Sequence, residues 1–466
     1  MTAIRKNKLD IVNGPVLGVL FSVSVPIMLN NVITSLYNLA DGLWVAQLSI
    51  VDFTATSFIW PPHFFFVSLG IGLAMAGTSI ISQLLGAGKI ERAESYAAHI
   101  FYFCLFIGIV FGTLGVVLAP AIIGGMGATG LLADRSVTYF SIIMVGFIFE
   151  MIYLSLYSIL AAQGQTRIMT TISLVIALVN VVLDPIFIFA KVPLIGTNGL
   201  NMGIAGAAWA TVISQVLRVF LAVLAVMSRH NEVRVHLRGI KLTKRQFSEI
   251  AKAGFPTALG QGSAALGFTL MNSVVVSYGQ ATLSAYSAVN RVSGFLMQPA
   301  NGVGSALTAI IGQNMGAQKI DRVKKFNRAA FQSITVITVA SAILLILLRN
   351  PLLKLFLGQA GDDADLVWKM ALEYVFYIAA MTPAMGYFNA FSGIFIGAGY
   401  HRYSAYLSIL RLWGLRLPIL LLFQRFTNLD ATGIWLAMLF SNVLLIPAGL
   451  WLYLRGKWLR EPRIDH

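Results

Sequence analysis

The stretch "QLLGAGKIER", which runs from Gln83 to Arg92, returns later in the chain as "QNMGAQKIDR", from Gln313 to Arg322. The two stretches share six residues at an offset of 230 positions, 313 minus 83. The same offset relates Pro26 to Pro256. A repeat that spans half of the chain indicates two homologous halves built on one plan.

The composition is that of an integral membrane protein. Hydrophobic residues make up 58% of the 466 residues and charged residues 11%, whereas a soluble domain has about 45–50% and about 25%. A membrane helix needs about 20 apolar residues, and polar breaks divide this chain into twelve such segments. The predicted spans are residues 16–46, 53–85, 95–120, 136–162, 168–190, 203–227, 250–278, 282–311, 329–349, 366–397, 404–425 and 432–454. We therefore predict an all-α fold with six membrane helices in each half.

The net charge of +15 follows the predicted topology. If the N-terminus is cytoplasmic, the termini and the even-numbered loops carry 23 of the 33 Lys and Arg residues. The outer loops and their margins carry six, and four lie within spans. This asymmetry is the positive-inside rule. It predicts a multi-pass protein of the inner or plasma membrane with both termini in the cytoplasm, and it argues against a nucleic-acid partner.

An even number of spans in each half gives both halves the same direction through the membrane. A pseudo-twofold axis along the membrane normal then relates two six-helix lobes, residues 1–227 and 253–466. A cytoplasmic linker at residues 228–252, which contains seven Lys or Arg residues, joins them. Secondary transporters commonly place such repeats around a central site. A structural pseudo-dimer with no transport role stays open at this point.

Two carboxylates lie within predicted spans of the first half. Asp41 follows "NLA" near the end of the first span, and Asp184 lies in "VNVVLDPIF" near the end of the fifth. Both odd-numbered spans run outward, so both acids reach the outer half of the bilayer. Tyr37 and Asn180 each precede an acid by four residues, which places them on the same helix face. An ionisable residue at membrane depth is costly and is usually functional.

The groups near these acids are rich in oxygen. Pro185 has no N–H, so the carbonyl of Val181 is left without its helical partner. Two carboxylates, an amide, a phenol and a free carbonyl suit a proton or a hard cation. The alternative is that each acid is structural and bonded to a neighbouring helix. The second half has no matching acid, because Asp41 corresponds to Met271 at the offset of 230.

Other intramembrane charges allow more than one interpretation. Glu150, in the middle of the fourth span, either faces a cavity or pairs with an arginine. His63 is expected near the outer end of the second span as an interfacial residue. Arg411 and Arg416 are five residues apart, so they share an α-helical face poorly. We expect both arginines to pair with helix ends or with acids.

The chain resembles the multidrug and toxic compound extrusion (MATE) family over essentially its whole length. The resemblance rests on "VPIMLNNVITSLYNLADGLWV" (Val25 to Val45), the paired "GAGKIER" and "GAQKIDR" loops, "LVNVVLDPIFIF" (Leu178 to Phe189) and "GIAGAAWATVISQ" (Gly203 to Gln215). Acids confined to the first half are similar to the DinF-type and archaeal branch of that family.

This resemblance implies an antiporter that exports organic cations against inward H⁺ or Na⁺, with no cofactor. It implies that Asp41, Asn180 and Asp184 form the proton-coupling cluster or bind Na⁺. It implies a role in substrate binding or in the hydrogen-bond network for four more residues, Tyr37, Thr34, Asn38 and Glu150. Pro26 would be the point where the first span bends. The family often has a hydroxyl where this chain has Ala205, which favours protons over sodium. Its partners would be small organic cations and the bilayer, and it would function as a monomer.

Two other classes of function are alternatives to a drug antiporter. A lipid-linked oligosaccharide or lipid flippase of the same superfamily is the alternative transporter, although such proteins often have basic cavities and additional spans. An intramembrane enzyme would need a catalytic constellation. The sequence has no H-E-x-x-H and no G-x-S-x-G motif, so we expect no enzymatic activity.

Overall fold

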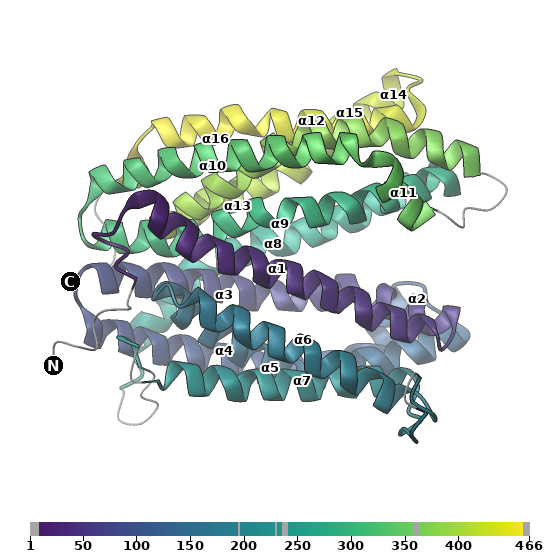
Figure 1. Ribbon diagram of the computed structural model, residues 1–466, viewed down its shortest axis with the longest axis horizontal. Coiled ribbons are helices and arrows are strands. Elements are labelled where there is room, and N and C mark those ends of the chain that lie inside the picture. The colour runs from purple at the N-terminus through teal and green to yellow at the C-terminus, as the bar shows by residue number, and fades with distance from the viewer. Residues whose placement is uncertain (1–8, 194–195, 229–230, 235–240, 358–363, 460–466) are drawn as a thin grey trace. The chain divides into compact units, whose positions relative to one another are not determined.

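The structure, a computed structural model, describes residues 9–193, 196–228, 231–234, 241–357 and 364–459. The described residues form helices that run along the length of each unit (Figure 1). The helices are α1 (Val16–Ala46), α2 (Ile50–Phe58), α3 (Trp60–Gly86), α4 (Ile90–Gly125), α5 (Gly130–Ala162), α6 (Thr166–Ile188), α7 (Ile204–Val226), α8 (Lys244–Ser277), α9 (Gln280–Gly316), α10 (Ile320–Leu347), α11 (Arg349–Leu357), α12 (Ala364–Gly397), α13 (His401–Ile409), the π-helix η2 (Leu410–Arg416), α14 (Leu417–Phe426), α15 (Asp430–Val443), α16 (Leu445–Leu454) and the 3-10 helix η3 (Lys457–Leu459).

Ten helical segments of the described chain are long and apolar enough to cross a membrane. Three of them join consecutive elements: α2 with α3, α13 with η2 and α14, and α15 with α16. The helices α9 and α12, of 37 and 34 residues, are also long enough to cross. The predicted all-α layout of twelve membrane helices is therefore confirmed.

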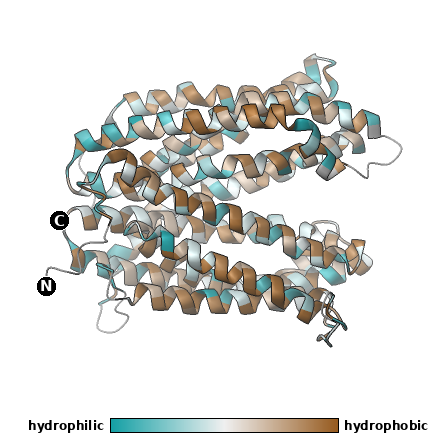
Figure 2. Cartoon of the chain, viewed as in Figure 1, coloured by the Kyte–Doolittle hydropathy of each residue, from teal (hydrophilic) through white to brown (hydrophobic). Residues whose placement is uncertain are grey.

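The outer surfaces of these helices are apolar. Figure 2 shows hydrophobic residues along most of the helix lengths. On α4, for example, Phe106 and Val117 are 60% and 69% exposed. A soluble protein rarely exposes apolar area on this scale, whereas lipid tails cover it without cost. The protein is a multi-pass membrane protein.

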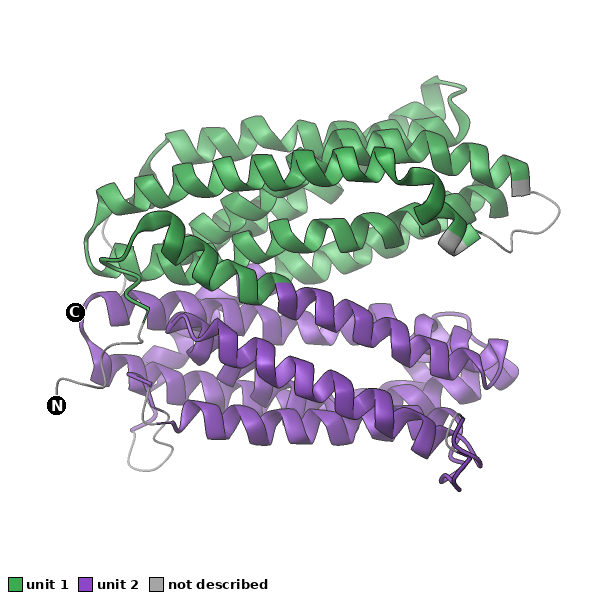
Figure 3. Cartoon of the chain, viewed as in Figure 1, with its two compact units in different colours: residues 1–28, 259–466 green, residues 29–258 purple. Residues whose placement is uncertain are grey.

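The chain forms two compact units (Figure 3). Unit 1 comprises residues 1–28 and 259–466, and unit 2 comprises residues 29–258. Two helices contribute to both units, since α1 passes from unit 1 to unit 2 and α8 passes from unit 2 to unit 1. The lobe boundaries expected from the sequence stay a prediction.

The repeated loops have the same backbone geometry in both halves. After α3, Gly88 has a φ of 72°, and after α9, Gln318 has a φ of 58°. The backbone N–H of the following lysine, Lys89 or Lys319, donates to a carbonyl oxygen five residues earlier at 2.9 Å in each case. This bond is the 6→1 hydrogen bond of a Schellman motif, which closes a helix C-terminus. Identical caps at an offset of 230 support a duplicated backbone plan.

Glycines allow the closest helix contacts. In unit 1, a Cβ at Gly393 on α12 would overlap the carbonyl oxygen of Gly304 on α9. In unit 2, a Cβ at Gly112 on α4 would lie 3.0 Å from the carbonyl oxygen of Met144 on α5. Small residues let membrane helices approach until their backbones touch, and the resulting van der Waals contact stabilises the bundle.

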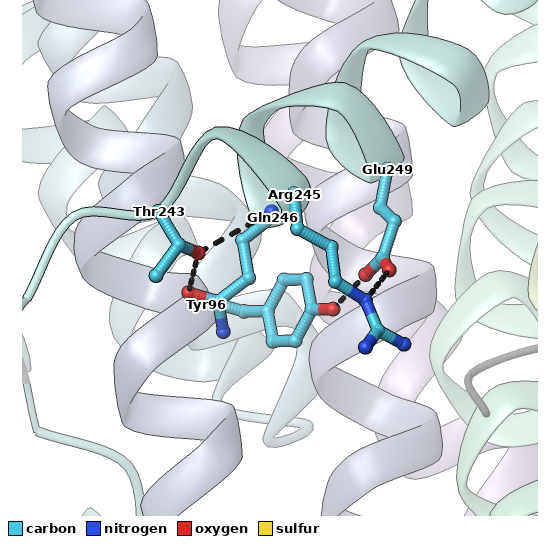
Figure 4. A network of polar contacts seen from close by, with 5 residues as sticks. All are labelled: Tyr96, Thr243, Arg245, Gln246 and Glu249. Atoms are coloured by element: carbon cyan, nitrogen blue, oxygen red, sulfur yellow. Dashed lines mark hydrogen bonds and ion pairs between the residues drawn. The ribbon is translucent and has the colours of Figure 1, made fainter. Parts of the chain in front are cut away.

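The start of α8 is held against α4 by a network of polar contacts (Figure 4). The Tyr96 phenol donates to one carboxylate oxygen of Glu249, and Arg245 Nε donates to the other at 3.0 Å. At the first turn of α8, the Thr243 hydroxyl donates to Gln246 Oε1 at 3.1 Å. These contacts fix the entry of α8 within unit 2.

A buried histidine completes this attachment. The backbone N–H of Thr243 donates to Nε2 of His99 at 2.9 Å, and Nδ1 of His99 lies 2.8 Å from the carbonyl oxygen of Ser95. Nδ1 must therefore carry the proton. Nearby, Gln163 Oε1 accepts from the backbone N–H of Glu232 at 2.8 Å. The described part of the linker is thus bound to unit 2 at several points.

Candidate functional site

Two carboxylates from different helices of unit 2 meet inside the bundle. The carboxyl groups of Asp41, near the end of α1, and Asp184, near the end of α6, are within hydrogen-bonding reach of each other. Asp184 is fully buried and Asp41 is partly buried. No donor among the described residues reaches Oδ1 of Asp41 or either carboxylate oxygen of Asp184 in hydrogen-bond geometry. The structure thus brings together two acids that the sequence placed at similar depth.

Two of the other predicted residues lie beside these acids. The buried Asn180 amide is next to Asp184, and the Tyr37 side chain is within electrostatic range of Asp41. We call Tyr37, Asp41, Asn180 and Asp184 the acidic cluster. Tyr139 of α5 interacts electrostatically with both acids and with Tyr37. Tyr139 was not predicted from the sequence, because a tyrosine in an apolar span carries no signal of its own.

Backbone hydrogen bonds fix the end of α6, where Asp184 lies. The last carbonyl groups of a helix have no partner within it. Here they accept from the segment that precedes α7: Leu200 N–H donates to the Ile186 oxygen at 2.8 Å, Met202 N–H to the Phe187 oxygen at 2.9 Å and Gly203 N–H to the Ile188 oxygen at 3.1 Å. The Asp184 side chain therefore stands on a helix end that is tied directly to the start of α7.

A polar stripe on α7, which was not predicted from the sequence, faces the same region. The Thr211 hydroxyl lies beside the Tyr37 phenol, and Arg218 is within electrostatic range of that phenol. The Arg218 guanidinium stacks over the Tyr153 ring at 5.0 Å, and its Nε has no hydrogen-bond partner among the described residues. Thr211, Gln215 and Arg218 recur at helical spacing in "TVISQVLR". That periodicity is the signal that could have identified them.

Thr34 and Asn38 lie on the same side of α1 as Tyr37 and Asp41, because residues three and four apart are neighbours on a helix. Both side chains are exposed. The Thr34 hydroxyl donates to a carbonyl of its own helix at 2.9 Å. On the opposite side of α1, Leu36 is 53% exposed. The helix thus has one polar side with the acidic cluster and one apolar side suited to lipid.

Glu150 has a partner that the sequence did not predict. Its Oε2 atom lies 3.3 Å from Nε2 of His63 on α3, and both side chains are about one-fifth exposed, 20% and 22%. From the sequence, we expected Glu150 to face a cavity or to pair with an arginine, and His63 to be an interfacial residue. The two residues are far apart in the sequence, so neither one indicated the other.

Pro26 lies inside α1, at a buried position. Because proline has no N–H, one backbone hydrogen bond of the helix is missing at this point. The first segment of unit 1 ends at residue 28, two positions after Pro26. The weak point of α1 therefore lies beside the place where the helix passes from one unit to the other.

Comparison with known protein families gives a consistent match across the chain. The MatE family model matches residues 26–186 and 256–422, once in each half. The curated relative "Probable multidrug resistance protein YpnP" of Bacillus subtilis (strain 168) is 27% identical over 463 residues, which cover 96% of this chain and 97% of the relative. "Probable multidrug resistance protein YoeA" of the same organism is 24% identical over 418 residues, 88% of each chain.

The fold matches a solved structure described as "Outward-facing conformation of a multidrug resistance MATE family transporter of the MOP superfamily". The TM-score is 0.88 at 22% sequence identity, with 98% of this chain and 99% of that chain covered. At this identity the likeness establishes the fold, and the chemistry has to be argued from the residues of the site.

Proposed function

The chain belongs to the MatE family of multidrug efflux transporters, and we propose that it exports organic cations in exchange for inward H⁺ or Na⁺. Asp41 and Asp184 are the coupling carboxylates in this proposal. The transporter has small-molecule substrates and lies in the membrane. Its cation selectivity, its coupling ion and the roles of individual residues are the parts that we propose.

One observation supports this proposal most strongly: the carboxyl groups of Asp41 and Asp184 lie together within an apolar bundle, and no Lys, Arg or His side chain of the described residues forms an ion pair with either. A single carboxylate at the centre of a bilayer costs about 2.5 to 3.5 kcal/mol on insertion scales. Two adjacent negative charges in the same place cost more, because they also repel each other. The pair is therefore stable only when a proton or a cation reduces its charge.

Competition at this pair is sufficient for antiport. An organic cation and the coupling ion both stabilise the acidic cluster by reducing its negative charge, so each weakens the binding of the other. The cluster is exposed alternately to the two sides of the membrane in this mechanism. When it faces outward, the coupling ion binds from the outer side and displaces the drug to that side. The coupling energy is the difference in affinity between the two states.

The other residues of the site receive supporting roles. For Na⁺, the ligands would be carboxylate oxygens of Asp41 and Asp184 and the amide oxygen of Asn180, which is the oxygen chemistry that hard cations favour. For H⁺, the two carboxylates would share the proton. Tyr37 would connect the cluster to the hydroxyl of Thr211. These are different predictions, and the identity of the driving ion separates them.

We further propose that α1 bends at Pro26 when the charge of the acidic cluster changes. The missing hydrogen bond makes this the position where α1 deforms at least cost. Asp41 lies on the same helix, so a change at the cluster has a direct mechanical path to Pro26. We also propose that the protein functions as a monomer in the cell membrane with both termini in the cytoplasm, and that it belongs to the DinF-type branch of the family.

The test uses proteoliposomes loaded with a fluorescent organic cation, with a pH gradient or a sodium gradient imposed separately. Wild type should show efflux driven by at least one gradient, and Asp41→Asn should lose this driven component. Asp134→Asn is the matched control, since Asp134 is an exposed acid on α5 of the same unit. It should transport as wild type does.

Either of two outcomes would overturn the proposal. Full ion-driven efflux by Asp41→Asn would remove Asp41 from the coupling mechanism. No driven efflux of any organic cation by wild type, combined with scrambling of labelled lipid across the same vesicles, would favour the flippase alternative.

A further inference from the structure

Two arginines are buried in the membrane span that α13, η2 and α14 form in unit 1. Arg411 is 9% exposed and Arg416 is 3% exposed. Among the described residues, Arg411 makes no hydrogen bond or ion pair, and Arg416 donates one hydrogen bond, from Nε to the Ser441 hydroxyl at 3.1 Å. The sequence-based expectation that both arginines pair with acids or helix ends is wrong for this part of the chain. Unpaired charges at this depth are costly and usually functional.

The π-helix turns the two arginines closer to a common face. The seven residues of η2 include both arginines. In a π-helix the hydrogen bonds run from residue i to residue i+5, so residues five apart lie nearer to one face than they do in an α-helix. Arg411 and Arg416 are within electrostatic range of each other. In an ordinary α-helix, Arg411 and Arg416 would share a face poorly. The change to a π-helix at this point removes that obstacle. Such segments occur frequently at functional sites.

The acids of unit 1 are engaged elsewhere or exposed. Among its described residues there are five, and none pairs with either arginine. Asp10 accepts hydrogen bonds from its own loop, Asp321 pairs with Lys324, and Glu373 accepts from the Thr432 hydroxyl at 2.7 Å. The remaining two, Asp365 and Asp430, are exposed. The region around the arginines therefore carries two positive charges and no negative charge from the described residues of unit 1.

An aromatic ring contacts one guanidinium group, and a hydroxyl group contacts the other. The Phe388 ring of α12 lies 4.3 Å from the guanidinium of Arg411. Arg416 Nε donates to the Ser441 hydroxyl at 3.1 Å, and Tyr286 and Tyr374 are within electrostatic range of this arginine. Stacked guanidinium planes keep their N–H groups at the edge available for a ligand. Both donors are thus positioned before any ligand arrives, which lowers the entropy cost of binding.

We propose that Arg411 and Arg416 form an anion-binding site in unit 1, which takes a phosphate or carboxylate group carried on an apolar molecule. The planar fork of arginine donors matches the oxygens of these groups and binds them with two parallel hydrogen bonds. An anion also neutralises the pair, which none of the five described carboxylates of unit 1 does. The aromatic rings beside the arginines suit an apolar body attached to the anionic group.

The repeat supports a division of charge between the halves. The turn before α6, with Gly164 at a φ of 72°, corresponds to the turn before α13, with Gly399 at a φ of 83°. The span that follows the first turn carries Asp184, and the span that follows the second carries Arg411 and Arg416. Equivalent helices therefore present charges of opposite sign. A site for anions in unit 1 is independent of the coupling role proposed for Asp184.

Two arms of one experiment distinguish a free organic anion from a lipid head group. In the first arm, calorimetry measures the binding of phenyl phosphate to the purified protein in a neutral detergent. In the second, native mass spectrometry measures the phosphatidylglycerol retained by the protein, with diacylglycerol as the lipid that lacks phosphate. Neither arm applies an ion gradient, so neither depends on the coupling mechanism.

Wild type should bind in at least one arm, and Arg411→Gln and Arg416→Gln should each bind at least tenfold more weakly. Arg411→Lys keeps the positive charge and loses the planar fork of donors. Its anion affinity should lie between those of wild type and Arg411→Gln. Arg402→Gln is the control, since Arg402 is exposed on the same span. A purely structural role would lower the melting temperature of the variants without changing anion affinity, and this result would overturn the proposal. So would the absence of saturable binding in both arms for wild type.

Discussion

Replacing His99 with leucine should release the start of α8 from α4. The substitution removes the hydrogen bond from the Thr243 N–H to His99 Nε2 at 2.9 Å, which joins the start of α8 to α4. The contact of Nδ1 with the Ser95 carbonyl lies within α4, so it does not resist the opening of α8. One hydrogen bond contributes about 1 kcal/mol net. A loss of about 1 kcal/mol raises the population of the locally opened state roughly fivefold, since 1.4 kcal/mol corresponds to a factor of ten.

Limited trypsin digestion measures this opening. The segment from Arg229 to Lys252 contains seven Lys or Arg residues, so any opening there exposes cleavage sites. When opening and closing are faster than cleavage, the cleavage rate follows the opened population. The initial rate of cleavage within this segment, followed by mass spectrometry, should therefore rise roughly fivefold in His99→Leu.

The control is His401→Leu. His401 is a buried histidine on α13 in unit 1, so its loss destabilises the protein away from the linker. Cleavage between Arg229 and Lys252 should then stay near the wild-type rate. A change of less than threefold in His99→Leu, or an equal rise in both variants, would refute the reasoning that His99 anchors α8 locally.

Three further predictions concern stability. Gly393→Val should prevent α12 from packing on α9, because even a Cβ would overlap a backbone oxygen; size-exclusion chromatography should show loss of the monodisperse protein. Arg135→Ala should lower the free energy of unfolding by about 0.5 kcal/mol, because it breaks an exposed ion pair. Arg135 Nε lies 3.4 Å from Asp52 Oδ1, and the arginine side chain is 45% exposed. The difference in melting temperature between wild type and variant should shrink as salt is added. Hydrogen bonds from the Asn13 side chain, and then from backbone N–H groups, lower the pKa of Asp10 below its ordinary value of 3.8. Its stabilising effect is fully present above the unfolded pKa and is lost as the pH falls through the lower folded pKa. The melting-temperature difference between wild type and Asp10→Ala should therefore be constant from about pH 5 to pH 8 and should decrease below about pH 4.

The membrane fold was predictable from the sequence because each signal is local. Apolar runs of sufficient length indicate spans, and the duplicated "GA-K" loops indicate their pairing into halves. These signals do not predict breaks within a span. The predicted second span is interrupted at Ile59, and a new helix, α3, begins at Trp60 with prolines in its first turn. The predicted length of this span nevertheless agrees with the structure, because α2 and α3 together form one membrane span.

The site was predictable only in part. Depth along a helix follows from counting residues, so the sequence could place Asp41 and Asp184 at the same level. Rotation about the helix axis and contact between distant helices do not follow from counting. For this reason the His63–Glu150 contact at 3.3 Å was missed, and so was Arg218. The π-helix was missed because its hydrogen-bond pattern depends on tertiary packing and has no periodic sequence signal.

The two halves of the chain share a backbone plan and differ in the sign of their buried charge. Identical caps at Gly88 and Gln318 show how faithfully the backbone is repeated. A backbone plan constrains where a side chain can stand, and the side chain decides which ligand is stabilised there. Unit 2 presents carboxylates that suit a proton or a cation, and unit 1 presents guanidinium groups that suit an oxyanion. Substrate selection in this transporter should therefore be tested with anionic and zwitterionic compounds as well as cations, since a screen limited to cations would examine only the chemistry of unit 2.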